Sequence, residues 1–297
     1  MKFFILLLTL ICSLKSFAKA QIIPTCSKIG SLLVVDEESN KILFETNSQK
    51  LIYPASLVKM MTAYLTFEAL EKNQLTLEQE LTFSARAQEI SRINKVNILG
   101  IKEGDKISVE KSLQALIIKS YNETAIVLAE AVADNEWDFV KKMNKKALEL
   151  GIINTSFRNA SGLHEEGQYT TASDLARLAL HLKKDFPQFY NFFSMKEFTY
   201  KNKIFKSHNR ILNEYEGAEG MKTGYTNASG YNLVSSAKNN KKRIFSVVTG
   251  CTSSRYRDDL SKFLLDLSFL ESTENNNLYF KKISLKNSNQ IYDNQRK

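Results

Sequence analysis

Stretches with β-strand character lie near both ends of this chain, and the long segment between them is helical in character. Ser31–Val35 and Lys41–Glu45 favour extended structure and flank a polar turn, which predicts an antiparallel hairpin. Tyr231–Ala237 and Arg243–Val248 alternate around a second polar turn and predict another hairpin. Strands at both ends of a domain with helices between them favour one antiparallel sheet built from both ends of the chain.

Apolar residues recur at helical spacing through the middle of the chain. Val58, Met61 and Leu65 follow this spacing and predict a helix that begins near Ser56. Further helices are predicted over Ser108–Ile118, Glu123–Val132, Asp138–Leu150, from the capping box at Thr171–Asp174 through Leu182, and over Ser254–Phe269. The predicted fold class is therefore α+β, an antiparallel sheet covered by helices on both faces, with an all-helical subregion.

The first twenty residues have the pattern of a secretory signal peptide. Lys2 provides a short charged region, Phe3–Leu14 is apolar, and Ala18-Lys19-Ala20 is a small-residue cleavage site. At about 1.5 Å per residue the apolar stretch is too short for a bilayer core of roughly 30 Å. We therefore predict export to the periplasm or cell-wall space, where nucleic acid is not an expected partner.

Composition excludes disordered and fibrous classes for the remainder of the chain. Hydrophobic residues make up 43% and charged residues 25%, as in globular proteins. Removal of the leader lowers the formal charge from +9 to +6, because the leader carries three lysines and no acid. Solvated surface lysines explain this excess, and attraction to an anionic polymer is the alternative. Residues 21–270 are predicted to form one catalytic domain.

Residues 271–297 are predicted to form a polar tail without a membrane anchor. Asn275–Asn277 and Asn287–Asn289 interrupt the apolar residues, so no sustained apolar face is available for a surface helix. A short strand over Leu278–Leu285 is the alternative. After cleavage of the leader, Cys26 and Cys251 remain, and whether they form a disulfide is left open.

Several kinds of chemistry lack their usual motifs in this sequence. The three histidines, His164, His181 and His208, are scattered, and neither a zinc-protease motif nor paired cysteines occur, so no metal and no cofactor is predicted. A nucleophile-elbow serine and a phosphate-binding glycine loop are also absent. A serine activated by a lysine one helical turn away remains, because residues i and i+3 share a helix face.

The pattern S-x-x-K starts at four positions, and only one has a suitable context. Ser16 lies in the leader, Ser108 begins a surface helix, and Ser235 lies on a strand, where i and i+3 face opposite ways. Ser56 and Lys59 fall in the first turn of a predicted helix, where unpaired N–H groups favour negative charge on oxygen. An ordinary helix cap is the alternative for Ser56.

Two further short motifs follow in the order that a serine–lysine enzyme requires. S-x-N occurs at Ser120-Tyr121-Asn122, between two predicted helices, and again at Ser207-His208-Asn209. K-T-G occurs once, at Lys222-Thr223-Gly224, at a predicted strand entry. Each motif alone is compatible with a turn or a cap. Together with Ser56 they form the motif set of penicillin-binding proteins and class A β-lactamases.

At this point the sequence closely resembles a family, the low-molecular-mass penicillin-binding proteins that are serine-type D-alanyl-D-alanine carboxypeptidases. The resemblance covers about Ile29–Leu270, and its longer phrases are Tyr53–Tyr64, Asn159–Leu163, Gln168–Ala172, Gly220–Thr226 and Gly230–Leu233. It implies the fold of the β-lactamases and penicillin-binding transpeptidases. It also implies peptidoglycan peptide stems as substrate and β-lactams as inhibitors.

The resemblance implies a catalytic role for four residues. Ser56 would attack the carbonyl between two D-alanines, and Lys59 would take its proton. Ser120 would relay the proton to the leaving amine, and Asn122 would orient Lys59 and bind a peptide carbonyl. Water would then hydrolyse the acyl-enzyme.

The same resemblance implies substrate-binding roles for Lys222, Thr223, Gly224 and Tyr225. Lys222 would supply positive charge near Ser120, and Thr223 would hydrogen-bond the terminal carboxylate. Backbone N–H groups of Ser56 and Tyr225 would form the oxyanion hole. Arg210 and Arg255 are two candidates for a second positive charge, and the sequence does not decide between them.

Two residues depart from the family pattern. Tyr121 stands where a small glycine is usual and Glu123 where aspartate is common, which predicts crowding of one wall of the cleft.

Three alternative functions stay open. A β-lactamase is less favoured because no E-x-x-x-N element occurs in Asn159–Thr171. A D,D-endopeptidase would use the same residues. A catalytically idle wall-binding protein would not need Ser56 and Lys59 intact.

Overall fold

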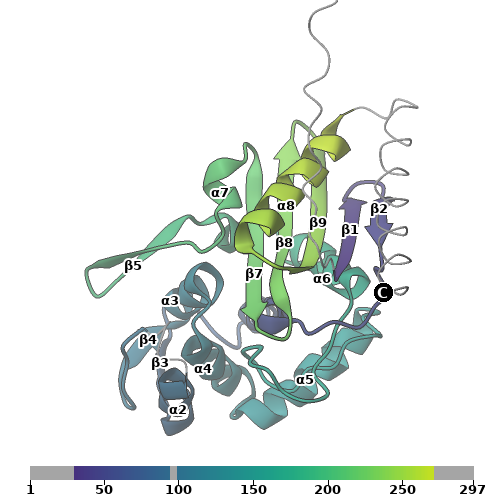
Figure 1. The fold of residues 1–297 in the computed structure, drawn as a ribbon. Coiled ribbons are helices and arrows are strands. Elements are labelled where there is room, and N and C mark those ends of the chain that lie inside the picture. The colour runs from purple at the N-terminus through teal and green to yellow at the C-terminus, as the bar shows by residue number, and fades with distance from the viewer. Residues whose placement is uncertain (1–29, 94–98, 271–297) are drawn as a thin grey trace, which may run out of the picture.

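A computed structural model describes residues 30–93 and 99–270 of the chain. Its main sheet has five antiparallel strands in the order β2-β1-β9-β8-β7, so strands from both ends of the described chain lie side by side (Figure 1). This arrangement confirms the single sheet expected from the sequence. The strands are β1 (Ser31–Asp36), β2 (Ile42–Thr46), β7 (Ala218–Thr226), β8 (Gly230–Asn239) and β9 (Lys242–Cys251).

Helices occupy most of the segment between β2 and β7. They are α1 (Lys59–Glu71), α2 (Ala85–Ile93), α3 (Val109–Gln114), α4 (Asn122–Ala133), α5 (Glu136–Glu149), α6 (Ala172–Asp185) and α7 (Ile211–Glu214), and α8 (Ser254–Phe269) follows the sheet. Two 3-10 helices, η1 (Ala55–Val58) and η3 (Tyr190–Ser194), and a π-helix, η2 (Ala115–Lys119), complete the helical elements. The helix expected over Ser108–Ile118 is thus α-helical only at its start.

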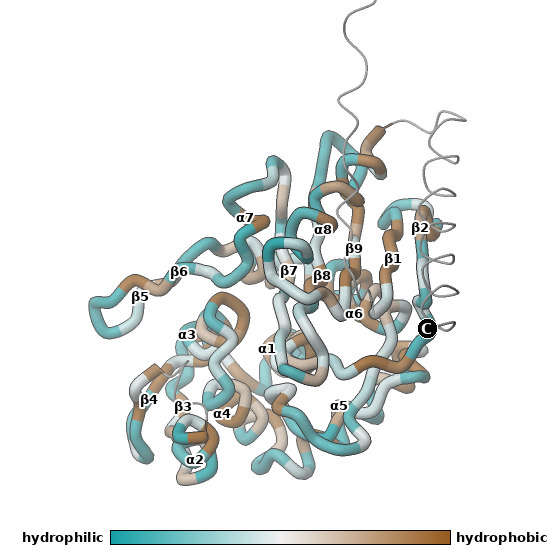
Figure 2. The backbone as a smooth tube through the Cα atoms, viewed as in Figure 1, coloured by the Kyte–Doolittle hydropathy of each residue, from teal (hydrophilic) through white to brown (hydrophobic). Residues whose placement is uncertain are grey.

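The central strands of the sheet are buried on both faces. In β1, Leu33 and Val35 belong to the large core that also contains residues of α1 and α6, whereas Leu32 and Val34 pack into a second core with α8. Alternate residues of a strand point to opposite faces, so an all-apolar strand indicates two covered faces. The expected fold class is confirmed, and Figure 2 shows the hydrophobic stretches along β1 and β9.

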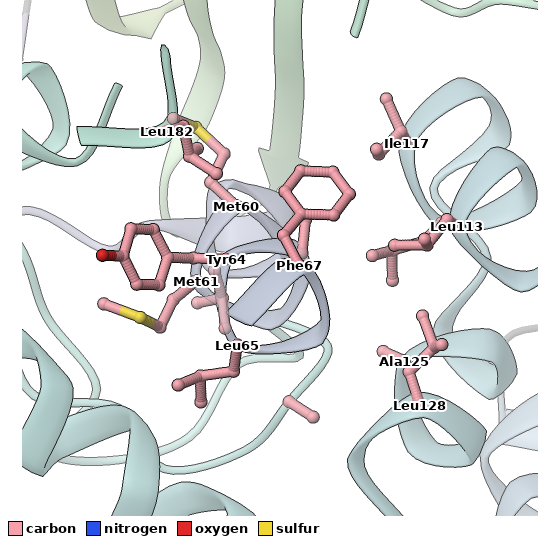
Figure 3. Packing of buried hydrophobic residues seen from close by; sticks show 14 of the residues in the cluster. Met60, Met61, Tyr64, Leu65, Phe67, Leu113, Ile117, Ala125, Leu128 and Leu182 are labelled. Atoms are coloured by element: carbon pink, nitrogen blue, oxygen red, sulfur yellow. The ribbon is translucent and has the colours of Figure 1, made fainter. Parts of the chain in front are cut away.

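Helix α1 is buried around its whole circumference. Met60, Tyr64 and Phe67 leave the helix in different directions, and residues of α3, η2 and α4 face it from one side (Figure 3). The sequence pattern indicated one apolar face, which underestimates this burial. A helix that is apolar on every side belongs to the centre of a protein, so α1 holds a fixed position between the sheet and the all-helical subregion.

Two small two-stranded sheets were not anticipated from the sequence. β3 (Glu80–Thr82) pairs with β4 (Lys106–Ser108), and β5 (Glu197–Tyr200) pairs with β6 (Lys203–Lys206). Strands of three or four residues are too short for a clear alternating pattern. The β5–β6 hairpin projects from the body of the molecule in Figure 1, and its turn is hydrophilic in Figure 2.

Three expectations concern residues outside the described ranges. The leader 1–20, the tail 271–297 and Cys26 all lie there, so cleavage, the fate of the tail and a Cys26–Cys251 disulfide stay predictions. Within the described ranges, no helix combines the length and the apolar character needed to cross a bilayer.

Gly162 lets the 159–163 loop approach the segment that begins the site. Its φ is +82°, and a Cβ there would collide with the carbonyl oxygen of Ala55 and lie 3.1 Å from the Cα of Ser56. Both the left-handed backbone and the close approach therefore require glycine.

We predict that Gly162→Ala destabilises the protein far more than Gly104→Ala. Gly104 has a similar φ of +85°, and a Cβ added there would have nothing within 4 Å, so only backbone strain of about 1–2 kcal/mol opposes the control variant. Gly162→Ala adds overpacking against fixed backbone and should cost at least about 2 kcal/mol more. Urea denaturation measures both, and equal losses would contradict the packing argument.

Candidate active site

Ser56 lies in the 3-10 turn η1 directly before α1, rather than in the first α-helical turn. The residue before it, Ala55, has a φ of +50°, a conformation that costs energy for any residue with a Cβ. Lys59 is the first residue of α1, and its Nζ is 3.2 Å from Ser56 Oγ. The i, i+3 spacing thus places both side chains on one face, as the sequence predicted.

The Lys59 amine is enclosed by oxygen acceptors. Besides Ser56 Oγ, it donates to Asn122 Oδ1 at 2.7 Å and to the backbone carbonyl of Ser161. The side chain is fully buried. Burial, and next the charge of Lys222, hold the pKa of Lys59 well below its ordinary value, while Glu123 acts in the opposite direction. A neutral amine in this position can accept the proton of Ser56.

The turn that presents Ser120 follows an irregular helix. The chain widens into the π-helix η2, and Ser120 ends it with φ +63° and ψ +31°, a left-handed conformation. π-helical turns are frequent at functional sites, and left-handed residues commonly end helices. Asn122 then opens α4, so Ser120 and Asn122 project from a short, well-fixed turn.

Lys222 comes from the middle of β7, not from its start as the sequence suggested. Its Nζ donates to Ser120 Oγ and to the carbonyl oxygen of Thr223, both at 2.9 Å. Burial, with a smaller effect from Arg257, lowers the pKa of Lys222 to about 7. The structure therefore contains two linked serine–lysine pairs, Ser56 with Lys59 and Ser120 with Lys222.

Ser56, Ser120 and Asn122 line a cleft of about 470 Å³, within the range of small-molecule sites. Strand β7 lies close to η1, because a Cβ on Gly224 would be 3.2 Å from both Pro54 O and Ser56 N. None of the described residues that line the cleft is acidic. The lining residues are Ser56, Ser120, Asn122, Gly162, Leu163, His208, Thr223, Gly224, Tyr225, Thr226, Asn227, Tyr231, Ser254 and Arg257.

The arginine at the cleft is Arg257, which the sequence analysis did not single out. Arg210 donates to Asp258 at 2.8 Å, and the side chain of Arg255 is 86% exposed, and neither lines the cleft. Arg257 is only 5% exposed and lies on the same buried face of α8 as Leu260 and Leu264. A charged residue on the apolar face of a predicted helix was the available signal.

The expected crowding by Tyr121 is wrong. The ring of Tyr121 is 3% exposed and packs against Phe198 and Phe205 of the β5–β6 hairpin, with an edge contact to Phe205 at 6.2 Å between centroids. The departure from glycine is therefore accommodated in a small core of its own. Glu123 is also buried and accepts a hydrogen bond from the Leu99 N–H at 2.7 Å.

Neither of the two other S-x-x-K occurrences in the described ranges brings a serine and a lysine side chain together, although the helix that Ser108 begins is more buried than expected. Ser108 caps α3 by accepting from the Lys111 N–H at 3.2 Å. On β8, Ser235 is buried while Lys238 is exposed, so the two side chains do not meet. Ser161 and His208 occur in the sequence motifs above without an assigned role, and both contact the site. Ser161 does so through its carbonyl oxygen, and His208 lines the cleft.

This sheet between helices, with a serine just before a buried helix and a lysine at its first residue, is the fold of the penicillin-binding proteins. Penicillin binding protein 5 from Haemophilus influenzae superposes with a TM-score of 0.78 at 31% identity, covering 86% of this chain and 73% of that one. Penicillin-Binding Protein D2 from Listeria monocytogenes, in its ampicillin-bound form, gives 0.71 at 28% identity, covering 82% and 97%.

A family profile described as D-alanyl-D-alanine carboxypeptidase matches residues 19–253, and the chain belongs to this family. It is 34% identical over 244 residues to D-alanyl-D-alanine carboxypeptidase DacF of Bacillus subtilis, and 36% identical over 240 residues to DacC of Escherichia coli. Each alignment covers 80% of this chain, and the chain spans only about three fifths of those relatives, 61% and 60%.

We predict that Lys222 makes folding stability depend on alkaline pH. With a pKa of about 7 in the folded protein and about 10.4 when unfolded, Lys222 binds fewer protons in the folded state between these values. Stability therefore rises from pH 7 to 10. Lys222→Met should reduce this rise in urea denaturation, whereas Lys238→Met, at an exposed position on β8, should leave it unchanged. An undiminished rise in Lys222→Met would contradict the prediction.

Proposed function

We propose that this protein is a penicillin-sensitive serine-type D-alanyl-D-alanine carboxypeptidase that removes terminal D-alanine from peptidoglycan peptide stems. The observation that carries the proposal is the buried Lys59 amine at 3.2 Å from Ser56 Oγ, which lines a cleft with no acidic side chain among its described residues. Such a cleft suits a substrate that ends in a carboxylate. Family membership supports the substrate class.

Acylation uses the first serine–lysine pair. Ser56 Oγ attacks the carbonyl carbon between the two D-alanines as Lys59 Nζ takes its proton. The backbone N–H groups of Ser56 and Tyr225 stabilise the oxyanion, with about 3 kcal/mol at stake for each donor. The close approach of Gly224 to Ser56 N supports this pairing, because it brings the two amides to one side of the cleft.

Departure of D-alanine uses the second pair. Ser120 Oγ passes a proton to the leaving nitrogen as the C–N bond breaks, and Ser120 in turn receives the proton that Lys59 took from Ser56, while Lys222 holds Ser120 Oγ in place. Thr223 and Arg257 bind the terminal carboxylate from the cleft wall, and Asn122 holds Lys59 while binding a peptide carbonyl. Water then adds to the ester carbon as Lys59, neutral again, takes one of its protons, and that proton passes to Ser56 Oγ as the ester C–O bond breaks.

A β-lactamase function has less support. Rapid hydrolysis of a penicilloyl ester needs a carboxylate that activates water, and the described cleft lining contains none. Glu165, in the loop after Leu163, instead accepts from Asn159 Nδ2 at 3.1 Å. A penicillin should therefore acylate Ser56 and remain attached.

We predict that penicillin forms one covalent adduct per mature chain. A β-lactam resembles the D-Ala-D-Ala terminus and traps the acyl stage. Intact-mass spectrometry should show the adduct in the wild type and its complete loss in Ser56→Ala, while Ser108→Ala keeps it. Persistent labelling of Ser56→Ala would remove Ser56 from its assigned role.

We predict that Lys59→Arg folds but loses acylation by at least about a hundredfold, because a permanently charged guanidinium cannot accept a proton. In the wild type, the acylation rate should fall as pH falls, since protonation of Lys59 removes the base. The rate of penicillin labelling measures both effects, and circular dichroism checks folding. Near-normal labelling of a folded Lys59→Arg protein would show that another group removes the proton.

A D,D-endopeptidase activity is the second candidate, and one comparison favours it. A D-alanyl-D-alanine endopeptidase from Haemophilus influenzae is 31% identical over 252 residues, and the alignment covers 82% of both chains. This chain thus matches more of that relative than of the carboxypeptidases. Incubation with a cross-linked muropeptide and with a pentapeptide decides between them by which substrate is cleaved faster.

The proposed place of action is the periplasm or cell-wall space. The signal-peptide pattern of residues 1–20 supports export, and residues 21–270 are proposed as the catalytic domain. Peptide stems are the proposed partner, with no role proposed for nucleic acid, and for residues 271–297 no membrane-anchoring role is proposed.

A further inference from the structure

His208 lies at the end of the cleft beside the second serine–lysine pair, and the reaction described above does not use it. It lines the cleft together with Ser120, Thr223 and Arg257. Its backbone N–H donates to the carbonyl oxygen of Ile118 at 3.2 Å, in the π-helix that leads to Ser120. The segment after β6 is therefore fixed to the turn that presents Ser120.

The contact with Lys119 determines which nitrogen of His208 carries hydrogen. Lys119 Nζ is 2.8 Å from His208 Nε2. An ammonium group has only donors, so Nε2 accepts, and the hydrogen of the neutral ring is on Nδ1. Lys119 thereby acts as a positioning residue that leaves His208 with one N–H group to offer.

The surroundings of His208 keep the ring neutral and favour an anion. Burial, and then the charges of Lys119, Lys222 and Arg257, lower the pKa of His208 to about 4. The ring is therefore a neutral donor near pH 7. Lys119, Lys222 and Arg257 all act on His208, although Arg257 is itself paired with the buried carboxylate of Asp258 at 2.7 Å, and none of the described residues that line the cleft is acidic. A carboxylate that enters here meets a positive field with an additional hydrogen-bond donor.

We propose that His208 is a specificity-determining residue that donates its Nδ1–H to the terminal carboxylate of the substrate, in a tautomer fixed by Lys119. This inference rests on the proposed function and adds His208 to the carboxylate ligands Thr223 and Arg257. It limits the substrate class further, since a peptide or β-lactam whose terminal carboxylate is masked offers this donor no charged acceptor.

The test compares benzylpenicillin with its methyl ester, which lacks the negative charge. Loss of a hydrogen bond to a charged group should lower the acylation rate constant of His208→Ala roughly tenfold to a hundredfold with the acid. The ester should react at the same rate with His208→Ala and with the wild type. His181→Ala, which removes a histidine on α6 that contacts Asp185, is the matched control and should leave both rates unchanged.

Two conservative variants separate hydrogen bonding from a structural role. An asparagine amide nitrogen can take the place of Nδ1, whereas that of glutamine reaches the place of Nε2. His208→Asn should therefore recover most of the rate with the acid, and His208→Gln should not. Lys119→Met, which frees Nε2, should also slow the acid and spare the ester.

Each outcome distinguishes this inference from the proposed function. If benzylpenicillin does not acylate the wild type at Ser56, the proposed function fails and the inference fails with it. If the wild type is acylated but His208→Ala reacts equally fast with the acid, only the inference is overturned. Equal losses with acid and ester, or equal rates for His208→Asn and His208→Gln, would show that His208 acts only structurally.

Discussion

The hydrogen bonds around the Lys59 amine are the constraint on which the arrangement of this molecule depends. A buried amine without polar partners would be costly, and each of its partners comes from a different part of the chain. Ser56 precedes α1, Asn122 opens α4, and the Ser161 carbonyl lies in the 159–163 loop. The central helix, the all-helical subregion and that loop must therefore meet at one nitrogen atom.

Burial of two lysines near one another gives this site its chemistry. Burial favours the neutral form of an amine, and a neighbouring positive charge adds to this effect, from Lys222 at Lys59 and from Arg257 at Lys222. Burial and the charge of Lys222 together lower the pKa of Lys59 further than a surface position would allow. Rigid elements hold both groups, since Lys59 begins a fully packed helix and Lys222 lies within a sheet strand. Small displacements of reacting atoms are therefore resisted by the core itself.

Much of the site could be predicted from short motifs, because the motifs fix chemistry and local geometry together. Ser56 and Lys59 needed only helical spacing, and the order of the motifs indicated the family. Arg257 was missed because arginine is usually a surface residue, although its spacing from Leu260 and Leu264 places it on the buried face of α8. The environment of His208 was also hidden, since its contact with Lys119 joins residues 89 positions apart. The core against which Tyr121 packs depends on the β5–β6 hairpin, whose strands are too short for a pattern.

The distances along the chain between the partners have a consequence for when the site can exist. Lys59 is joined to residues 63 and 102 positions later, and Lys222 bonds Ser120 across 102 positions. Closing loops of this length is costly in entropy until the surrounding contacts form. A nascent chain that ends before β7 contains Ser56 and Lys59, but it lacks Lys222 and the cleft wall that β7 provides. We infer that Ser56, the proposed nucleophile, stays unreactive during synthesis and gains its reactivity only with tertiary folding, so that the topology of the chain itself sets the timing.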